Sequence, residues 1–360
     1  MPTQTFRQVT IVGNAQQRGR SYGEQLADEI LQTVKVYREL LPRSDDFLLA
    51  GGERVRNYLK SLDPNLGGDL VAEIDAIGEA IRGRYDFDAR WLYALNARTE
   101  LLGLGVDECT SVCFQETGLL GQNWDWARAL EERVVFMTIV PDDGPTIWML
   151  TEPGIIGKIG MNSSGVGACL NILRCRRDSL PIDGLPIHLV LRAILNSESL
   201  NEARETLMAY HIDTASNILA GDGAGACFDV EFAGTEQRWL AYDAAVTLHT
   251  NHYCADGTHL NAGFEDELQS SFNRYARGSE LVSKLSAFGL AEMDELLCDQ
   301  SGDLPINREY VPYAGFPPQH TVGTVATLLM DLRNRQLYLR RGPYRPDQDL
   351  VEMPLGSPIS

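Results

Sequence analysis

The amino-acid sequence changes character near Val106, where helical periodicity gives way to strand-like segments. Beyond this point the segments are short and are separated by Gly, Pro, Asn and Asp turns. The strands come in two blocks and a final pair, with helices inserted between the blocks instead of in regular alternation. This arrangement predicts α+β layers with antiparallel sheets.

The expected elements can be placed along the chain from the spacing of apolar residues. Before Val106, one strand is predicted at 9–13 and helices at 21–41, 70–81 and 90–102. Later strands are predicted at 109–114, 118–126, 133–140, 146–151, 156–161, 165–172, 215–221, 226–233, 236–242, 246–251, 321–331 and 335–340. Later helices are predicted at 187–195, 200–210, 270–287 and 290–298. The Pro-rich piece 305–318 is expected to be a surface loop, and the tail after Pro343 a loosely ordered end.

Composition limits the classes of partner and compartment. The 360 residues are 44% hydrophobic, which supports a substantial buried core, and carry a formal net charge of −19. Such a chain is not expected to bind nucleic acid or anionic membrane, because both attract positive patches. The seven cysteines are an odd number at irregular spacing, which favours a reducing compartment over a disulfide framework. The sequence shows neither a signal peptide nor an apolar run long enough to span a membrane, so we expect a cytoplasmic protein.

Cys109 has the most informative surroundings of any residue in the chain. It heads the run Cys109-Thr110-Ser111-Val112-Cys113-Phe114, and after a Glu-Thr-Gly turn the chain returns through Gly121-Gln122-Asn123-Trp124-Asp125. A free cysteine is most often a small buried apolar residue, which is how we interpret Cys113. The polar neighbours of Cys109 instead favour a reactive thiol at one end of a hairpin. If the chain were cut before Cys109, the new α-amine, with a pKa of roughly 7.7–8.0, could take the thiol proton.

Other polar residues near strand ends are candidates for supporting such a nucleophile. Asp125 and Asn123 lie in the strand expected to pair with the one that begins at Cys109, where an acceptor can hold the α-amine. Asn251 and Asn171 each lie at the end of a predicted strand, and an asparagine amide is a common donor to an oxyanion. A single asparagine in such a place is more often a turn-capping residue, so the sequence pattern alone leaves both roles open.

Histidines and a cysteine between 249 and 259 have the composition of a metal site but not its spacing. His249 and His252 are three residues apart in a strand-like run, so their side chains are expected on opposite faces of the sheet. We therefore predict no metal. The glycine-rich run 221–225 joins two strands and lacks a following lysine, so we interpret it as a hairpin turn and predict no cofactor.

A set of motifs, in this order, resembles the penicillin acyltransferase family (acyl-CoA:6-aminopenicillanic acid acyltransferases) of N-terminal-nucleophile cysteine hydrolases. More distantly, the motifs resemble choloylglycine hydrolases and penicillin V acylases. They are Cys109-Thr110-Ser111, Gly121-Gln122-Asn123-Trp124-Asp125, Gly160-Met161-Asn162-Ser163-Ser164-Gly165-Val166-Gly167, Leu170-Asn171 and Thr250-Asn251-His252. The helix Leu95-Asn96-Ala97-Arg98-Thr99-Glu100 resembles the propeptide region of that family. Where the choloylglycine branch has an arginine this chain has Gln122, so bile-salt chemistry is not expected.

The resemblance implies a four-layer αββα sandwich in which two antiparallel sheets lie between helical layers. It also implies a precursor, or zymogen, that cuts itself between Glu108 and Cys109. In that scheme residues 1–108 form a mostly helical propeptide, or α-chain region. Residues 109–345 form the catalytic core, integrated with it in one domain, and residues 346–360 form a tail. The α and β fragments of the precursor are expected to stay associated.

The resemblance also assigns roles to individual residues of this chain. Cys109 is the nucleophile, its freed amine is the general base, and Asp125 contacts that amine. Asn251 is the oxyanion donor. Asn171 corresponds to a further polar site residue of the family, and Ser111 to a hydroxyl residue involved in self-processing. Arg274 corresponds to an arginine that lies late in the family's sequences.

We therefore predict an autoproteolytically activated cysteine amidohydrolase or acyltransferase that cleaves or forms a non-peptide amide bond through an acyl-thioester on Cys109. The expected partner is a small-molecule amide or acyl donor, such as an acyl-CoA or an N-acyl amine, and a homo-oligomer is compatible with the sequence. Candidates for an apolar acyl pocket are Trp124, Trp126, Phe136, Trp148 and Tyr253. One alternative is a papain-like pair of Cys109 with His252 in an uncut chain. Another is a non-catalytic binding module that keeps the fold.

Overall fold

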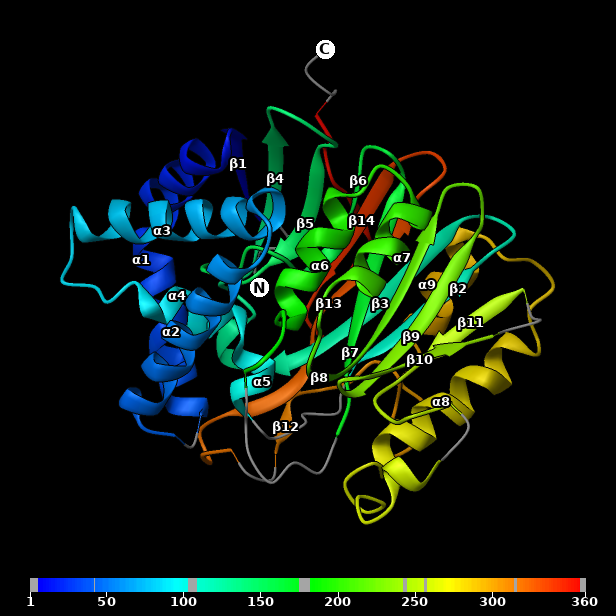
Figure 1. Cartoon of the computed structure of the whole chain (residues 1–360). Coiled ribbons are helices and arrows are strands. Elements are labelled where there is room, and N and C mark those ends of the chain that lie inside the picture. Colours follow the sequence, from blue (N-terminus) through cyan, green and yellow to red (C-terminus); the bar gives the residue numbers. More distant parts are fainter. Residues whose placement is uncertain are drawn as a thin grey trace.

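The computed structural model describes residues 6–41, 43–102, 109–174, 182–241, 245–255, 258–313 and 316–356. Two β-sheets lie face to face at the centre, and helices cover the outer face of each sheet (Figure 1). The predicted α+β architecture of two sheets between helical layers is confirmed.

The larger sheet has eight strands. In spatial order they are β1 (Arg7–Gly13), β4 (Val135–Pro141), β5 (Ile147–Thr151), β6 (Ile159–Asn162), β7 (Val166–Ile172), β8 (Thr214–Asp222), β9 (Cys227–Gly234) and β10 (Glu236–Leu240). Neighbouring strands are antiparallel except for β1 and β4, which run parallel. The expectation of purely antiparallel sheets was wrong at this edge. A parallel neighbour needs a long connection, and the helices and the hairpin between β1 and β4 supply it.

The second sheet has seven strands and contains Cys109 at its margin. In spatial order they are β11 (Val246–His249), β2 (Thr110–Phe114), β3 (Leu119–Ala127), β13 (Thr321–Asp331), β14 (Gln336–Arg341) and β15 (Val351–Glu352), with β12 (Val311–Pro312) beside β13. The predicted hairpin is β2–β3, in which Thr110 lies opposite Asn123. The tail expected to be loosely ordered instead adds β15 to β14, because the buried side chain of Met353 anchors it to the core.

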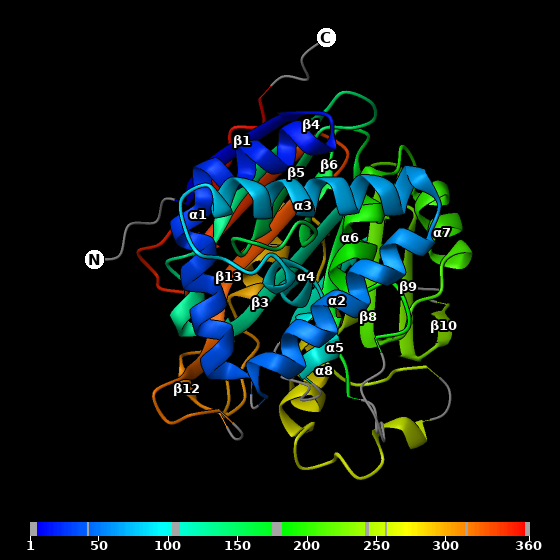
Figure 2. The ribbon, with the colours of Figure 1, turned by 60° about the vertical axis from the view of Figure 1, so that its left-hand side comes forward.

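Seven helices of the described residues belong to the layer outside the larger sheet, and Figure 2 shows α1, α2 and α3 in front of the sheets. They are α1 (Ala15–Leu40), α2 (Asp45–Ser61), α3 (Asp69–Arg82), α4 (Arg90–Asn96), α5 (Arg98–Leu102), α6 (Ile187–Asn196) and α7 (Leu200–Ala209). The opposite layer contains α8 (Gln269–Val282) and α9 (Leu290–Leu297), which contact β11, β3 and β13. Short helical turns lie at Pro64–Gly68, Arg128–Leu130 and Thr258–Asn261.

Helix α2 was not predicted, and two glycines explain why. Gly51 and Gly52 interrupt its apolar stripe and lower its helix propensity. Both are buried, and a Cβ atom at Gly52 would lie 2.2 Å from the carbonyl oxygen of Arg90 in α4. The glycines therefore permit close packing of α2 on α4, which compensates for their poor local propensity.

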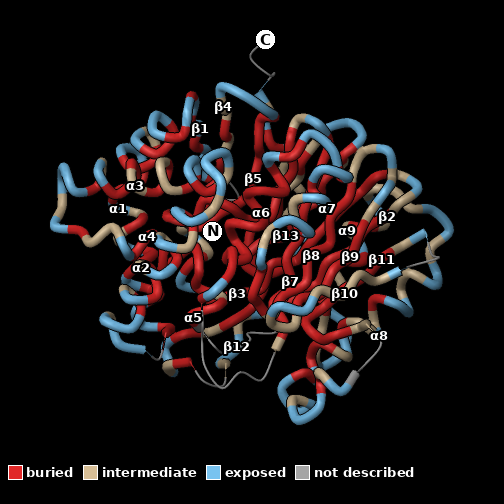
Figure 3. The backbone as a smooth tube through the Cα atoms, in the orientation of Figure 1, coloured by how far each residue is buried: buried red, intermediate tan, exposed pale blue. Residues whose placement is uncertain are grey.

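The central strands are buried on both faces, as Figure 3 shows by the continuous buried colour along β3 and β7. Because a second sheet covers one face and helices cover the other, polar residues of these strands must find partners inside the protein. Among the described helices, none has the combination of length and apolar composition needed to span a bilayer. The polar residues that are buried in β2, β3 and β7 define the candidate site.

Candidate active site

The backbone of Cys109 is held by two side chains from distant parts of the chain. Its N–H donates to Oδ1 of Asn251 at 2.7 Å, and its carbonyl accepts from Nη1 of Arg274. Nη2 of Arg274 also donates to Oδ1 of Asn251 at 2.8 Å, which closes the triangle. The structure thus brings together the residue before β2, the loop after β11 and helix α8.

Asn251 and Arg274 are themselves fixed by further hydrogen bonds. Nδ2 of Asn251 donates to the carbonyl of Ile172 at 2.9 Å, and because an amide nitrogen carries two hydrogens, the second has no partner among the described residues. The N–H of Asn251 donates to Oγ of Ser271 at 2.7 Å. Arg274 is fully buried and donates to Oγ1 of Thr110 at 2.8 Å. Both side chains are therefore oriented before any substrate binds.

Ser111 and Asn171 form a link between the two sheets close to Cys109. Nδ2 of Asn171, on β7, donates to Oγ of Ser111, on β2, at 2.6 Å and to Oδ1 of Asn217, on β8, at 2.8 Å. Asn217 in turn donates to Asp229 on β9. Oδ1 of Asn171 is buried and has no hydrogen-bond partner in the described ranges. Asn171 therefore holds Ser111 directly, whereas no bond from Asn171 to Cys109 is present among these residues.

Asp125 lies on β3 opposite Thr324, at a bulge in the pairing of β3 with β13. The carboxyl group is buried, and neither oxygen makes a well-formed hydrogen bond to the described residues. Burial raises the pKa of Asp125 to about 7, although Arg274 and, to a smaller extent, Thr324 favour the ionised form. An unpartnered buried carboxyl costs free energy, so this position is suited to a cation that forms later.

The thiol of Cys109 is held in its protonated form. Burial raises its pKa to about 11, and the neighbouring Asp125 adds to this, while the backbone N–H of Asp125, Arg274 and Lys158 act in the opposite direction. A thiolate is the reactive nucleophile, so this thiol needs a base at neutral pH. His252 is not placed to be that base, as the next contacts show.

Both ring nitrogens of His252 face groups other than the thiol of Cys109. Its Nδ1 lies 2.9 Å from Oγ of Ser271 and its Nε2 lies 3.5 Å from Sγ of Cys254. Burial, with the nearby His249 and Arg274, lowers the pKa of His252 to about 3. Within the described residues there is no contact between His252 and Cys109, so the structure does not assemble the papain-like pair.

A narrow cavity lies beside Cys109 between the two sheets. Its free volume, about 10 Å³ measured to the centre of a water-sized sphere, holds roughly one water molecule. Trp124 and Trp126 line it, as expected for the acyl pocket, but Phe136, Trp148 and Tyr253 are not part of its wall. Its lining residues are Arg98, Cys109, Gln122, Trp124, Asp125, Trp126, Lys158, Ile159, Leu170 and Ile172. The predicted cut site joins Cys109 to Glu108, which lies outside the described residues.

Two polar neighbours on β3 have structural partners that account for them. Gln122 donates to and accepts from the backbone of Leu170, so it links the two sheets. Asn123, the alternative to Asp125, donates to the carbonyls of Leu297 and Ile306 and accepts from Thr327 at 2.7 Å. Asn123 therefore connects β3 to the α9 side of the sheet, whereas Asp125 makes no well-formed hydrogen bond within the described residues.

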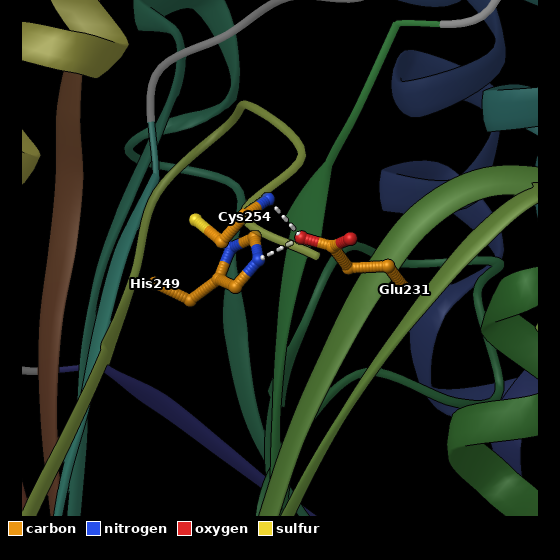
Figure 4. A group of neighbouring side chains, drawn as sticks. All are labelled: Glu231, His249 and Cys254. Carbon is orange, nitrogen blue, oxygen red and sulfur yellow. Dashed lines mark hydrogen bonds and ion pairs between the residues drawn. The ribbon is translucent and has the colours of Figure 1, made fainter. Parts of the chain in front are cut away.

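Glu231, His249 and Cys254 form the cluster with the donor types of a metal site, drawn in Figure 4, and their ligand atoms lie within 4.8 Å of one another. Nε2 of His249 is 2.9 Å from Oε1 of Glu231, and Nδ1 is 2.7 Å from the carbonyl of Thr250. Burial alone would lower the pKa of His249, but Asp229, Cys254 and Glu231 raise it well above its usual value. With both nitrogens facing acceptors, His249 fits an imidazolium paired with Glu231 better than a metal ligand.

The sequence analysis considered His249 and Cys254 as donors but missed their partner Glu231. Glu231 comes from the larger sheet and His249 from the smaller one, and Glu231 also accepts from the backbone N–H groups of Cys254 and Ala255. The cluster thereby holds the loop that carries Asn251. Ser271 and Asn217 were missed as well, although their positions beside polar neighbours in otherwise buried segments are a signal that the sequence contains.

The chain is similar to known acyltransferases along almost its whole length. Residues 113–345 match the family described as Acyl-coenzyme A:6-aminopenicillanic acid acyl-transferase. The 40 kDa form of acyl-coenzyme A:6-aminopenicillanic-acid-acyltransferase from Emericella nidulans is 33% identical over 350 residues, which cover 95% of each chain.

Among solved structures, penicillin V acylase from Agrobacterium tumefaciens has a TM-score of 0.39 and 13% identity, covering 68% of this chain and 86% of that one. A mutant of conjugated bile acid hydrolase from Clostridium perfringens has a TM-score of 0.45 and 14% identity, covering 69% of this chain and 93% of that one. On the family match and the identity to the Emericella acyltransferase, the chain belongs to the acyl-coenzyme A:6-aminopenicillanic acid acyltransferase family.

Proposed function

We propose that this chain is the precursor of a cysteine acyltransferase or amidohydrolase that cuts itself before Cys109 and then forms an acyl-thioester on the thiol of that residue. The observation that supports this best is the backbone of Cys109, whose N–H, in the peptide bond proposed to be cut, is bound by Asn251 and whose carbonyl, in the following peptide bond, is bound by Arg274. A buried residue held on both sides in this way is positioned for chemistry at its own peptide bond.

The self-processing step is an N-to-S acyl shift. Sγ of Cys109 attacks the carbonyl carbon of Glu108, the C–N bond breaks, and the amine takes the proton that the thiol gives up. Water then hydrolyses the thioester, which releases the Glu108 carboxylate and restores the thiol beside a free α-amine. Ser111, held by Asn171, is proposed to assist the proton transfers.

Turnover uses the groups that the cut creates. The α-amine of Cys109 takes the thiol proton, and the thiolate attacks the carbonyl carbon of an amide or acyl donor. The remaining hydrogen of Nδ2 of Asn251 stabilises the oxyanion, and the α-ammonium returns its proton to the leaving group. Asp125 is the partner of the α-ammonium, which accounts for a buried carboxyl that makes no well-formed hydrogen bond to the described residues of the uncut chain. Water or an amine then takes the acyl group from the thioester.

Intact mass and amino-terminal sequencing of three proteins test the proposal. The wild-type protein is expected to give two fragments, the second beginning Cys-Thr-Ser, whereas Cys109→Ala remains one chain. Turnover of an acyl donor is expected to fall at least about 10³-fold in Cys109→Ala, since the nucleophile is lost. Cys113→Ala, which removes a buried cysteine on the same strand, is the matched control and should still be cut and active.

Three outcomes contradict the proposal. Cleavage or turnover retained by Cys109→Ala would exclude Cys109 as the nucleophile. A wild-type protein that stays in one piece and turns over no acyl donor would support the binding module instead. A wild-type protein that is active but uncut, and that loses all activity in His252→Gln, would favour the cysteine–histidine alternative, because the proposal expects cleavage and only a moderate loss from that substitution.

A further inference from the structure

Two thiols that the proposed mechanism does not use lie close together between the two sheets. Cys113 is on β2 of the smaller sheet, Cys227 is the first residue of β9 in the larger sheet, and both are free cysteines. A free cysteine inside a protein is most often a packing residue, which is how the sequence analysis interpreted Cys113. A chemical role for the pair therefore has to follow from how the two thiols are placed.

The strand pairing puts each thiol beside a neighbour of the other. Thr247 of β11 lies opposite Cys113 in the smaller sheet, and its Oγ1 is 3.6 Å from Sγ of Cys227. Gly221 of β8 lies opposite Cys227 in the larger sheet, and a Cβ atom at Gly221 would be 3.5 Å from Sγ of Cys113. The two cysteine side chains are also joined by a hydrogen bond. The sulfurs are thus neighbours although they belong to different sheets.

The sheets approach each other closely at this place. Stacked sheets are usually about 10 Å apart, whereas β2 and β8 have Cα atoms within 8 Å of one another. Gly221 has no side chain to fill the space on β8, and the thiol of Cys113 lies there instead. A disulfide between sheets needs such an approach, because its two Cα atoms usually lie within about 7 Å of each other.

The pair consists of one acidic thiol and one that stays protonated. The hydrogen bond from Cys113 is the main reason that the pKa of Cys227 lies below its usual value. Hydrogen bonds from Thr247 and Gln115 act in the same direction, whereas burial and Asp229 oppose them. The bond to Cys227, together with burial, raises the pKa of Cys113 well above its usual value. Cys227 is only half-buried, so an accessible thiolate lies beside a second thiol, as in cysteines that react with peroxide.

The other described thiols between the sheets lack this combination. Cys169 of β7 is fully buried, its Sγ is 3.8 Å from the carbonyl oxygen of Gly121, and burial raises its pKa well above the usual value. In the uncut chain, burial likewise raises the pKa of Cys109 to about 11. Oxidation is therefore expected to begin at Cys227 and not at these two residues.

We propose that Cys113 and Cys227 form a redox-active pair, which hydrogen peroxide converts to a disulfide that joins the two sheets. The Cys227 thiolate attacks one oxygen of the peroxide, the O–O bond breaks, and the sulfur becomes a sulfenic acid. The hydroxide that leaves takes up the proton that the Cys227 thiol had released. Sγ of Cys113 then attacks the sulfenic sulfur, the S–S bond forms and the S–O bond breaks, and the Cys113 proton leaves with the hydroxide as water. The two sulfurs together lose the two electrons that the peroxide gains.

Such a disulfide links two strands on which the candidate site depends. β2 begins next to Cys109, and β9 carries Glu231, which accepts from the backbone of the loop that contains Asn251. Because Cys113 and Cys227 are far apart in the chain, the bond restricts the unfolded chain and is expected to stabilise the fold. Disulfides that form transiently are compatible with a reducing compartment. Cys109 takes no part in the reaction, so the pair can be tested whether or not the chain is cut.

Peptide mapping of the Cys109→Ala protein tests the pair in the absence of the proposed nucleophile. In this variant trypsin is expected to release peptides 99–128, 159–174 and 205–238, which contain a single cysteine each, namely Cys113, Cys169 and Cys227. The folded protein is treated with hydrogen peroxide, and the remaining thiols are then blocked with N-ethylmaleimide. Peptides 99–128 and 205–238 are expected to be linked, and dithiothreitol should separate them.

Other patterns of modification contradict the pair. A link from either peptide to 159–174 would show that Cys169 is the partner. A sulfinic acid at Cys227 beside a maleimide-blocked Cys113 would show that the two sulfurs do not meet. Reduced thiols at both positions after peroxide treatment would also overturn the proposal.

Two variants in the same background are the controls. Cys227→Ser cannot form the bond. Cys298→Ser removes another half-buried thiol, which contacts Asp294 and Arg340 and no second thiol of the described residues, and the linked peptides should still form. Oxidation is expected to raise the Tm by about 2–8 °C in the Cys109→Ala and Cys298→Ser proteins and not in Cys227→Ser. A linked protein whose Tm does not rise would contradict a bond that joins the folded sheets.

The rate at which iodoacetamide labels Cys227 tests the hydrogen bond separately. Cys113→Ala removes the donor, so the midpoint of the pH–rate profile for Cys227 is expected to move to higher pH. Cys113→Ser keeps a hydroxyl donor and should move the midpoint less. An unchanged midpoint in Cys113→Ala would overturn the activation of Cys227 by its neighbour.

Discussion

Asp125 shows how one residue connects the uncut and the cut protein. In the uncut chain its carboxyl is buried without a well-formed hydrogen bond to any described residue, and its pKa is raised to about 7 mainly by that burial. The folded chain therefore binds more protons than the unfolded chain between about pH 4 and pH 7. It follows that ionisation of Asp125 makes the uncut chain less stable as the pH rises through this window.

The first prediction concerns this ionisation in the uncut Cys109→Ala background. Adding Asp125→Asn is expected to leave stability almost unchanged near pH 4 and to raise it near pH 8, by on the order of 2–4 kcal/mol, since Asn cannot ionise. Urea unfolding at several pH values measures the difference. The control is Asp142→Asn, an exposed turn residue, for which no such trend is expected. A difference that does not change with pH would show that the Asp125 carboxyl is not destabilised by ionisation.

At the scale of elements, Glu73 joins three helices of the outer layer. It is buried in α3 and accepts from Arg18 of α1 at 2.9 Å and from Arg192 of α6 at 2.8 and 2.9 Å. Burial alone would raise the pKa of Glu73, but Arg192 and Arg18 outweigh it and hold the pKa below its usual value. Its ionised form therefore stabilises the fold above about pH 4, and this contribution is lost as the pH falls below that.

Removal of the Glu73 charge should loosen this junction. Glu73→Gln leaves two buried guanidinium groups without a counter-charge and is expected to cost about 3–5 kcal/mol at pH 7, measured by denaturant unfolding. Glu280→Gln is the matched control, because Glu280 also contacts two cations, Arg277 and Lys284, but on the surface. Its removal is expected to have little effect. Equal effects of the two substitutions would contradict the claim that burial sets the strength of this junction.

At the scale of the whole molecule, the part of the chain before Cys109 pairs with and packs against the part after it. β1 pairs with β4 from Arg7 opposite Val135 to Gly13 opposite Pro141. Nδ2 of Asn96 donates to the carbonyl of Gly154 at 2.9 Å, and the Glu73 junction adds a buried ion pair. A cut before Cys109 breaks none of these contacts, so we propose that the two fragments remain one folded unit.

This proposal predicts how the cut protein behaves on fractionation. Both fragments are expected to co-elute in size-exclusion chromatography in buffer and to separate only under denaturing conditions. A chain that begins at Cys109 and is expressed alone is expected to be insoluble, because it exposes the face of the larger sheet that α1 covers. An amino-terminal fragment that elutes separately in buffer would exclude the proposed single unit.

Several features of the fold and the site could be predicted because their signals are local. The residue pattern of a strand, a turn glycine such as Gly165, with φ of +84°, and the polar residues around Cys109 can each be recognised from a few neighbouring residues. Helix α2 was missed because Gly51 and Gly52 disrupt its local pattern, and only contact with α4 explains them. The parallel pair β1–β4 has no local signal either, because it joins strands that are far apart in the chain.

The sequence by itself determined the α+β class, the position of the candidate nucleophile at the head of a hairpin, and the family resemblance. Only the tertiary structure decided which side chains meet there. Asn251 and Arg274 lie 142 and 165 residues beyond Cys109. The cavity beside Cys109 is lined both by Arg98, which precedes Cys109 in the chain, and by Lys158, which follows it. Such contacts depend on how the two sheets and their helices pack, and that packing is set by burial summed over the whole core and not by any local pattern.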